Sequence, residues 1–210
     1  MSFIINFFVA AVLMGTTLMY GTLGEILTEK SGNMNLGVEG LVYMGGSSGL
    51  IAAFLYERAA GANAIPMVAV ILAFVAAFLA AALGSLLYAF LTITLRTNQN
   101  VTGLALTIFG VGYGEFFGEY FRQIGDGRLQ ISEAAGGIFS QPLLPAFLRN
   151  IPVVGKMLFS YNFMIYLVLV IAIVMAWYFS RTRSGLCLRA VGEDPGTADA
   201  AGINVTRYKY

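Results

Sequence analysis

Two glutamates within apolar stretches are the residues of this sequence that could do chemistry at membrane depth. Glu39 and Glu115 are the charges nearest to the middle of such stretches. An ionisable group inside a membrane is energetically costly, and it usually faces a cavity, a partner or a transport pathway. Glu115 lies near the end of its stretch and is expected at the membrane interface. Glu39 is therefore the candidate for a residue on a path through the membrane.

Covalent catalysis has few candidate residues in this chain. There is no histidine, which excludes a His-based zinc site and the Ser-His and Cys-His catalytic pairs. The single cysteine, Cys187, excludes an intrachain disulfide and a cysteine-cluster metal site. No GxxxxGK(S/T) phosphate-binding loop is present, which excludes a P-loop ATPase. We expect no enzymatic activity, no metal and no cofactor.

The composition places these residues in a membrane protein. Of the 210 residues, 58% are hydrophobic and 11% are charged. The mean hydropathy is +0.78. Soluble domains carry charge on about a quarter of their residues, so an ordinary soluble enzyme and a disordered tail are excluded. The net charge of +1 gives no basic face for nucleic acid. We predict an all-α, polytopic bundle of transmembrane helices that contacts the lipid bilayer.

Five apolar stretches are long enough to approach or reach the roughly 20 residues that a transmembrane helix needs. The third stretch has about 30 residues, which predicts a helix that is tilted or projects from the bilayer. Glycines at 110, 112 and 114 interrupt the fourth stretch and weaken its prediction. The five predicted spans are residues 3–27, 36–55, 65–95, 101–117 and 162–179.

Positive charges predict the orientation of these spans. Three arginines come directly after the fifth span, namely Arg181, Arg183 and Arg189. Cytoplasmic loops carry an excess of lysine and arginine, so residues 181–210 are expected to be a cytoplasmic region. Lys30 and Arg96 fall in links that the same topology places inside. The loop at 119–161 and the N-terminus are then outside.

Small residues occur at helical spacing in the third and fourth spans. Such residues let helix backbones approach closely in lipid, where packing drives association. The pattern predicts a tightly packed bundle, and it fits either static packing or a helix that slides during gating. In the fourth span the small residues of one predicted helix face are Gly103, Thr107, Gly110, Gly114 and Gly118.

Glu39 lies in a segment whose composition should break a helix. Residues 32–40 contain three glycines and three polar or charged side chains, Asn35 among them. Broken backbone at membrane depth is tolerated only inside protein or beside water. Discontinuous helices near the midplane are how many transporters expose backbone to a substrate. The segment is either such a break or a cytosolic turn with an interfacial Glu39, and the residues alone leave both open.

The region after the fifth span contains a predicted short helix over residues 195–201. Asp194 before a proline is typical of a helix start, and Gly202 suits a helix end. Isolated helices shorter than roughly 12 residues are marginal in water, so this one needs a docking surface. Ile203 and Val205 are apolar anchors for it. The helix either lies on its own protein or inserts into a partner subunit.

Three stretches of the sequence resemble one family of transport proteins. Residues 29–40 and 98–103 are similar to two signatures of bacterial ABC importer permeases of the branched-chain amino acid, ribose and nucleoside type. Residues 188–203 are similar to the coupling region of these permeases. The order and spacing of the three match across nearly the whole chain. Within the family, the chain looks closest to the simple-sugar and nucleoside branch.

The resemblance implies partners and roles that composition does not give. Such permeases pair, often as heterodimers, around a central pore in the plasma membrane. They receive substrate from an extracytoplasmic binding protein and are driven by two ATP-binding subunits. Coupling to the ATP-binding subunit is expected from Glu193, Asp194, Pro195, Ala200, Gly202 and Ile203. The substrate path or gate is expected from Asn35, Glu39, Asn98 and Gln99.

One departure from the family and two rival functions remain. Family members continue for roughly three to five further spans, whereas this sequence ends at Tyr210, so it is expected to be the N-terminal portion of a longer permease. An ion-coupled secondary transporter would need carboxylates in mid-span, for which only Glu39 is a candidate. A membrane enzyme would need clustered catalytic groups, and the nearest approach to a cluster is Glu115, Glu119 and Arg122.

Overall fold

The chain folds into helices, five of which are long and apolar enough to cross a membrane. The computed structural model describes residues 2–125, 127–145, 147 and 154–210, and the regular elements in that part are helical. This confirms the predicted all-α bundle and its five spans. The long helices are α1 (Ser2–Lys30), α2 (Val38–Ala60), α3 (Pro66–Ala89), α4 (Gln99–Ile124) and α8 (Phe163–Arg181).

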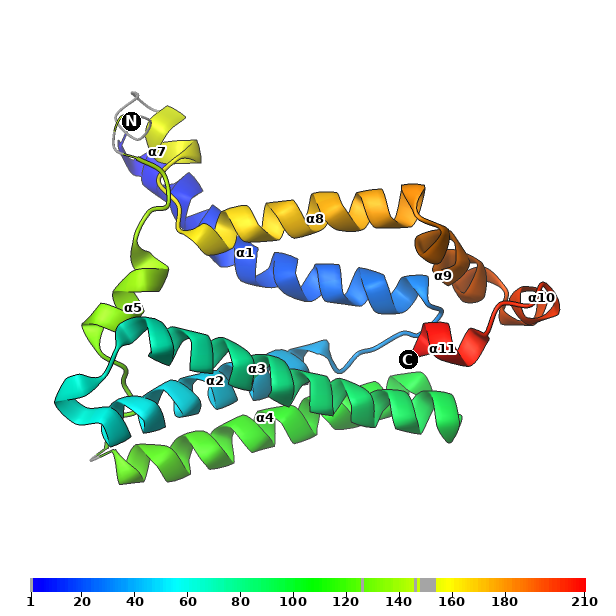
Figure 1. The fold of residues 1–210 in the computed structure, drawn as a ribbon, viewed down its shortest axis with the longest axis horizontal. Coiled ribbons are helices and arrows are strands. Elements are labelled where there is room, and N and C mark those ends of the chain that lie inside the picture. Colours follow the sequence, from blue (N-terminus) through cyan, green and yellow to red (C-terminus); the bar gives the residue numbers. More distant parts are fainter. Residues whose placement is uncertain (1, 126, 146, 148–153) are drawn as a thin grey trace.

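The long helices form two groups that lie side by side (Figure 1). Helices α2, α3 and α4 pack tightly together, and α1 pairs with α8. The short helices α5 (Glu133–Ser140) and α7 (Val154–Leu158) lie toward the end of the molecule that holds the N-terminus. Three further helices lie at the opposite end, namely α9 (Arg183–Glu193), α10 (Pro195–Ala200) and α11 (Val205–Lys209).

Small residues set the close approach of α2 to its neighbours. A methyl group at Gly49 would lie 2.9 Å from the Ala73 carbonyl oxygen of α3. On the other side, a methyl group at Gly110 of α4 would lie 2.5 Å from the Gly40 Cα. Backbones this close leave no room for a side chain, as expected where packing rather than hydrophobicity holds helices together.

Helix α4 is longer and more regular than predicted. It is one continuous helix from Gln99 to Ile124, so the fourth predicted span is present and its glycines do not interrupt it. Gly103, Gly110 and Gly114 are buried in the contact with α2 and its preceding link. Tertiary packing therefore offsets their low helix propensity. Gly118 has no neighbour within 4 Å of its Cβ position and lies outside this contact.

The predicted end of the second span also needs correction, whereas the ends of the third span do not. Helix α2 begins at Val38 and continues to Ala60, five residues beyond the predicted end, because the polar residues of its last turn stay helical. Helix α3 is followed directly by a π-turn, η2 (Phe90–Thr94), so the third span has the predicted length of about 30 residues. A short 3-10 turn, η1 (Gly61–Asn63), follows α2 in the connection to α3.

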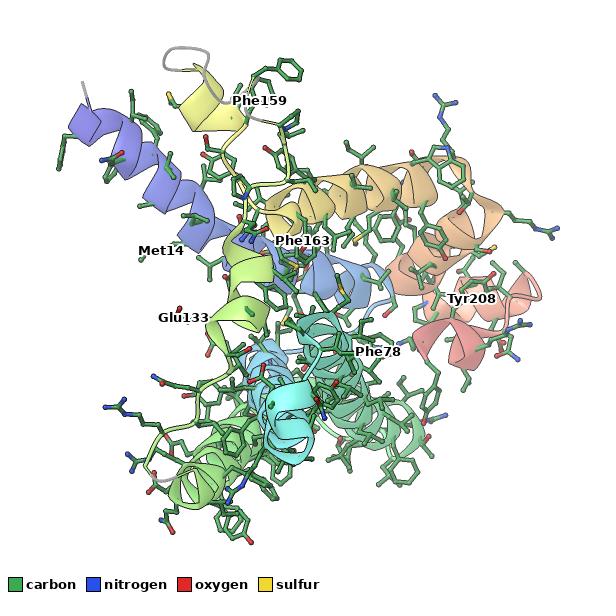
Figure 2. The ribbon with its side chains drawn as sticks, turned by 60° about the vertical axis from the view of Figure 1, so that its left-hand side comes forward. Met14, Phe78, Glu133, Phe159, Phe163 and Tyr208 are labelled. Atoms are coloured by element: carbon green, nitrogen blue, oxygen red, sulfur yellow. The ribbon has the colours of Figure 1, made fainter. Side chains whose placement is uncertain are left out.

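Aromatic rings and polar contacts join the two groups of helices at the N-terminal end of the molecule. Phe74 of α3, Phe139 of α5 and Phe163 of α8 form a cluster with ring centroids 5.7–6.4 Å apart. Figure 2 shows Phe163 at the start of α8, beside α5. The Asn162 side-chain amide at the start of α8 donates a hydrogen bond of 2.7 Å to the Phe139 carbonyl of α5. The segment α5 therefore connects the two helix groups.

Candidate functional site

The link between α1 and α2 turns back into the bundle. Helix α1 ends in a Schellman motif, in which Gly32 has φ +79° and its N–H donates to the Glu29 carbonyl at 2.9 Å. The Asn33 N–H donates to the Thr28 carbonyl at 3.1 Å and completes the motif. Residues 31–37 then run without regular structure to the start of α2. The predicted helix break over 32–40 is therefore confirmed at 31–37, whereas Glu39 lies in the first turn of α2.

The start of α2 lies deep between its neighbours. Gly40 contacts Gly110, which is eleven residues into α4, or about 16 Å at a rise of 1.5 Å per residue. Leu41 contacts Gly84, which is ten residues before the end of η2, or about 15 Å. Measured along either neighbouring helix, the start of α2 therefore lies about 15 Å inside the bundle. The link accordingly enters the bundle from the end that carries α9–α11 (Figure 1).

Buried polar side chains hold this link in place. The Asn35 Oδ1 accepts a hydrogen bond of 2.9 Å from the Gly37 N–H, and the Asn35 N–H donates to the Glu25 Oε1 at 3.0 Å. The other carboxylate oxygen of Glu25 accepts from the Thr28 hydroxyl at 3.0 Å. Asn35 is almost fully buried. It is thus a structural element of the link, because its side chain satisfies backbone that no helix satisfies.

The second predicted signature also supports the link. The Gln99 Oε1 accepts from the Met34 N–H at 2.9 Å, and the Tyr88 hydroxyl donates to the Met34 carbonyl at 2.6 Å. The Thr107 hydroxyl donates to the Leu36 carbonyl at 2.8 Å. The Asn98 side chain caps α4 by accepting hydrogen bonds from the N–H groups of Asn100 and Val101. Of the predicted path residues, the structure brings Asn35 and Gln99 to the link and uses Asn98 as a helix cap.

Glu39 lies apart from this network, on a groove between α1, α2 and α4. The groove has a volume of about 570 Å³ and is also lined by Glu25. Glu39 is exposed. Its carboxylate accepts no hydrogen bond from a described residue and forms no ion pair with one. Glu115 is exposed on α4 outside this groove. Among the described residues, no three His, Cys, Asp or Glu side chains are grouped as a metal site would require.

The predicted short helix after the last span is present as α10. The Asp194 carboxylate accepts from the N–H groups of Gly196 at 2.9 Å and Thr197 at 3.2 Å. The Thr197 hydroxyl, followed by these two N–H groups, lowers the pKa of Asp194. At the other end, Gly202 has φ +82°, and the Ile203 N–H donates to the Ala198 carbonyl at 3.0 Å. Both predicted capping residues are confirmed as caps.

Helix α10 exposes most of its surface. Ala198 is buried against α9 and α11, and Ile203 is half-buried. The helix therefore packs on its own chain, which was one of the two docking surfaces expected from the sequence. Its other surface is open, and the exposed residues include Glu193, Asp194, Pro195 and Ala200.

Helix α9 connects α10 to the link, and the sequence reasoning did not predict it. Thr182 ends α8 and caps α9, accepting from the Gly185 N–H at 3.0 Å. At the other end of α9, a methyl group at Gly192 would lie 2.9 Å from the Lys30 carbonyl carbon and 3.0 Å from the Gly32 nitrogen. The end of α9 and the start of the link are thus in direct backbone contact.

Several residues that support the link were not predicted from the sequence. Glu25, Tyr88 and Thr107 support the link from three different helices, and only their tertiary positions reveal this. Gly192 was within a recognised motif, but its contact partner is 160 residues away in the sequence. For Glu25, the sequence offered one indication of a role, namely that it is a charged residue near the end of an apolar helix. The pair Glu119 and Arg122 forms an exposed ion pair of 2.8 Å within α4, which does not favour the membrane-enzyme alternative.

Five helices long enough to span a membrane, a link that enters the bundle and an exposed helix α10 supported by α9 and α11 define a polytopic membrane protein. The chain belongs to the branched-chain amino acid transport system permease component family, whose model matches residues 6–210. This confirms the predicted resemblance. Members of this family are multi-pass proteins of the plasma membrane with a transport role.

Curated relatives agree with this assignment. A putative glucose ABC transporter permease of Haloferax volcanii is 32% identical over 211 residues, which cover 100% of this chain and 58% of that protein. A nucleoside ABC transporter permease of Lactococcus lactis is 32% identical and covers 95% and 59%. A guanosine ABC transporter permease of Bacillus subtilis is 31% identical and covers 96% and 62%. The chain spans about three fifths of the length of these relatives. No solved structure matches it significantly.

Proposed function

We propose that this chain belongs to a permease subunit of an ATP-binding-cassette importer for a simple sugar or a nucleoside. The family match and the glucose, nucleoside and guanosine permeases among its relatives support this substrate class. Its partners are then an ATP-binding subunit, a second permease subunit that completes the pore, and an extracytoplasmic substrate-binding protein. The absence of a charged residue from α3 fits a helix that faces lipid.

The single observation that carries the proposal is the contact between α9 and the α1–α2 link. Gly192 packs against the backbone of Lys30 and Gly32, and α10 follows immediately with most of its surface exposed. A helix that projects from the bundle and rests on a re-entrant link can transmit a push from a partner into the bundle. The hydroxyls of Thr94 and Tyr210 provide a second contact, between η2 and the end of α11.

The charge distribution supports the proposed orientation. Seven lysines and arginines belong to the end of the molecule with α9–α11, namely Lys30, Arg96, Arg181, Arg183, Arg189, Arg207 and Lys209. By the positive-inside rule, this end faces the cytoplasm, where the ATP-binding subunit is. The N-terminus is then outside the cell. Binding of ATP would close the ATP-binding subunits, push α10 and α9, and shift the link that contains Asn35.

Reconstitution of the full-length subunit with its partner subunits tests this function. We expect uptake of labelled glucose or guanosine into vesicles that depends on ATP enclosed in the vesicles and on binding protein added outside. Replacement of Asp194 and Gly202 by alanine should reduce uptake while the complex still assembles. Uptake that follows an ion gradient in the absence of ATP would contradict the proposal and favour the secondary transporter.

A further inference from the structure

The groove between α1, α2 and α4 lies at the depth where α2 begins. It has a volume of about 570 Å³, within the range of roughly 300–1,000 Å³ typical of small-molecule sites. Thr17 contributes to it from a position thirteen residues before the end of α1, or about 20 Å along the helix. The groove is lined mainly by apolar residues, and its polar members are Thr17, Thr22, Glu25, Glu39 and Tyr43.

Three of these polar side chains have no partner among the described residues. The Glu39 carboxylate, the Thr17 hydroxyl and the Tyr43 hydroxyl make no hydrogen bond there, and all three residues are exposed. By contrast, Glu25 is bonded to the link and Thr22 donates to the Leu18 carbonyl at 2.9 Å. The groove therefore offers one free anionic acceptor and two free hydroxyls on a surface that is otherwise apolar.

Lipid cannot be the occupant of this groove. A carboxylate in contact with hydrocarbon costs several kcal/mol, so such groups face a water-filled cavity or a polar partner. The comparison within the same molecule is α3, whose exposed side chains, such as Leu83, are mostly apolar and which carries no charge. The polar groove is thus suited to the aqueous pathway, and the surface of α3 is suited to lipid.

We infer that this groove is a transit subsite for a neutral ring compound that carries several hydroxyls, the chemistry shared by sugars and nucleosides. Hydroxyls of the ligand donate to Glu39 and bond to the Thr17 hydroxyl, while the ring of Tyr43 covers an apolar face of the ligand. One unpaired carboxylate favours a hydroxyl donor over an anionic substrate, which it would repel. This inference rests on the proposed function and adds the location and groups of a binding site.

Cysteine labelling in the full-length, assembled importer tests the subsite. All native cysteines, Cys187 among them, are replaced by serine, and Thr17→Cys or Leu83→Cys is introduced. A charged, water-soluble thiol reagent reacts with the thiolate, which forms in water and hardly at all in lipid. We expect rapid labelling of Thr17→Cys and slow labelling of the control Leu83→Cys, which has a 66% exposed native side chain on α3.

Ligand protection then separates a binding site from a merely wet surface. Guanosine or glucose, at a concentration twice its dissociation constant, should slow the labelling of Thr17→Cys by about threefold, because the free site falls to one third. Adding Glu39→Leu should abolish this protection, because the anionic acceptor for the hydroxyls of the ligand is lost. Labelling as slow as that of Leu83→Cys, or rapid labelling that neither compound slows, would overturn the inference.

The same preparations distinguish this inference from the proposed function. ATP-dependent uptake by the cysteine-free importer is measured in parallel. Normal uptake together with an unprotected or unlabelled Thr17→Cys overturns the subsite alone. Absence of ATP-dependent uptake of both compounds counts against the proposed function, whatever the labelling shows.

Discussion

Gly32 and Gly192 meet backbone to backbone, although 160 residues separate them in the sequence. A methyl group at Gly32 would lie 3.1 Å from the Gly192 Cα, and Gly32 has φ +79°, which a residue with a side chain rarely adopts. The contact joins the last turn of α9 to the point where α1 ends and the link begins. It connects the end of α9, which α10 follows, to the link that runs into the α2–α4 group.

Replacement of Gly192 by alanine should uncouple ATP hydrolysis from transport. The added methyl group would overlap the Lys30 carbonyl, and overpacking of this kind costs about 1–3 kcal/mol. We expect α9 to move off the link, so that ATP-dependent uptake falls by about tenfold while the basal ATPase of the assembled complex remains. Parallel measurements of uptake and ATPase in proteoliposomes check this.

The matched control for Gly192→Ala is Gly112→Ala. Gly112 lies on α4 with no atom within 4 Å of its Cβ position, so a methyl group there meets open space. Uptake by Gly112→Ala should equal that of the unmodified importer. If Gly192→Ala transported as well as this control, the contact between α9 and the link would have no part in coupling.

The contact between α4 and α2 makes a second prediction, on stability. Gly110→Ala would force α4 away from Gly40, whereas Gly112→Ala adds a methyl group on the open side of the same helix. We expect the first variant to lose about 1–3 kcal/mol of unfolding free energy. At roughly 2–4 °C per kcal/mol for a chain of this size, its Tm in detergent should fall by several degrees. Equal Tm values for the two variants would show that the helices are not held at this distance.

The sequence was sufficient to predict elements that depend on local chemistry. Runs of apolar residues predicted the five spans, because a membrane helix must satisfy its own backbone. Asp194 and Gly202 predicted the ends of α10, because capping involves only neighbours in the chain. The break after Lys30 was predicted for the same reason, since glycine and asparagine disfavour a continuous helix locally.

Features set by distant contacts could not be predicted in the same way. Whether the break was a cytosolic turn or lay within the bundle depended on the contact of Gly40 with Gly110. That Asn35 and Gln99 line a path stays a prediction, and their hydrogen bonds to the link backbone show that they also support the link. Polar residues in a membrane segment can serve either purpose, and only the position of their partners decides between them.

Tyr88 makes a third prediction because its hydroxyl holds the link. The side chain is 4% exposed, and its hydroxyl donates to the Met34 carbonyl at 2.6 Å. Tyr88→Phe keeps the ring and removes this bond, at an expected cost of about 0.5–1.5 kcal/mol. The Tm should fall by a few degrees, and amides of residues 33–37 should exchange hydrogen faster in mass spectrometry.

The control for Tyr88→Phe is Tyr120→Phe near the end of α4. Tyr120 is 54% exposed, and its hydroxyl has no hydrogen-bond partner among the described residues. We expect Tyr120→Phe to leave both the Tm and the exchange of the link unchanged. Faster exchange of residues 33–37 in both variants, or in neither, would mean that the Tyr88 hydroxyl does not order the link.

The fourth prediction concerns pH and the start of α10. Hydrogen bonds from the Thr197 hydroxyl and from the N–H groups of Thr197 and Gly196 lower the pKa of Asp194. Because the pKa in the folded helix is below that in the unfolded chain, the ionised cap stabilises α10 above the usual carboxyl pKa of about 3.9. This stabilisation is lost as the pH falls through the lowered pKa.

Variants of Asp194 separate the charge of the cap from its geometry. Asparagine caps helices about as well as aspartate and does not titrate, whereas alanine caps poorly. At neutral pH, we expect the amides of residues 195–200 to exchange several-fold faster in Asp194→Ala and at nearly the native rate in Asp194→Asn. Between pH 5 and about pH 3, the native protein should lose protection relative to Asp194→Asn at each pH, because only its cap becomes protonated. A constant ratio of the two exchange rates over this range would contradict the role of the Asp194 carboxylate, and equal exchange in Asp194→Ala at neutral pH would contradict the cap itself.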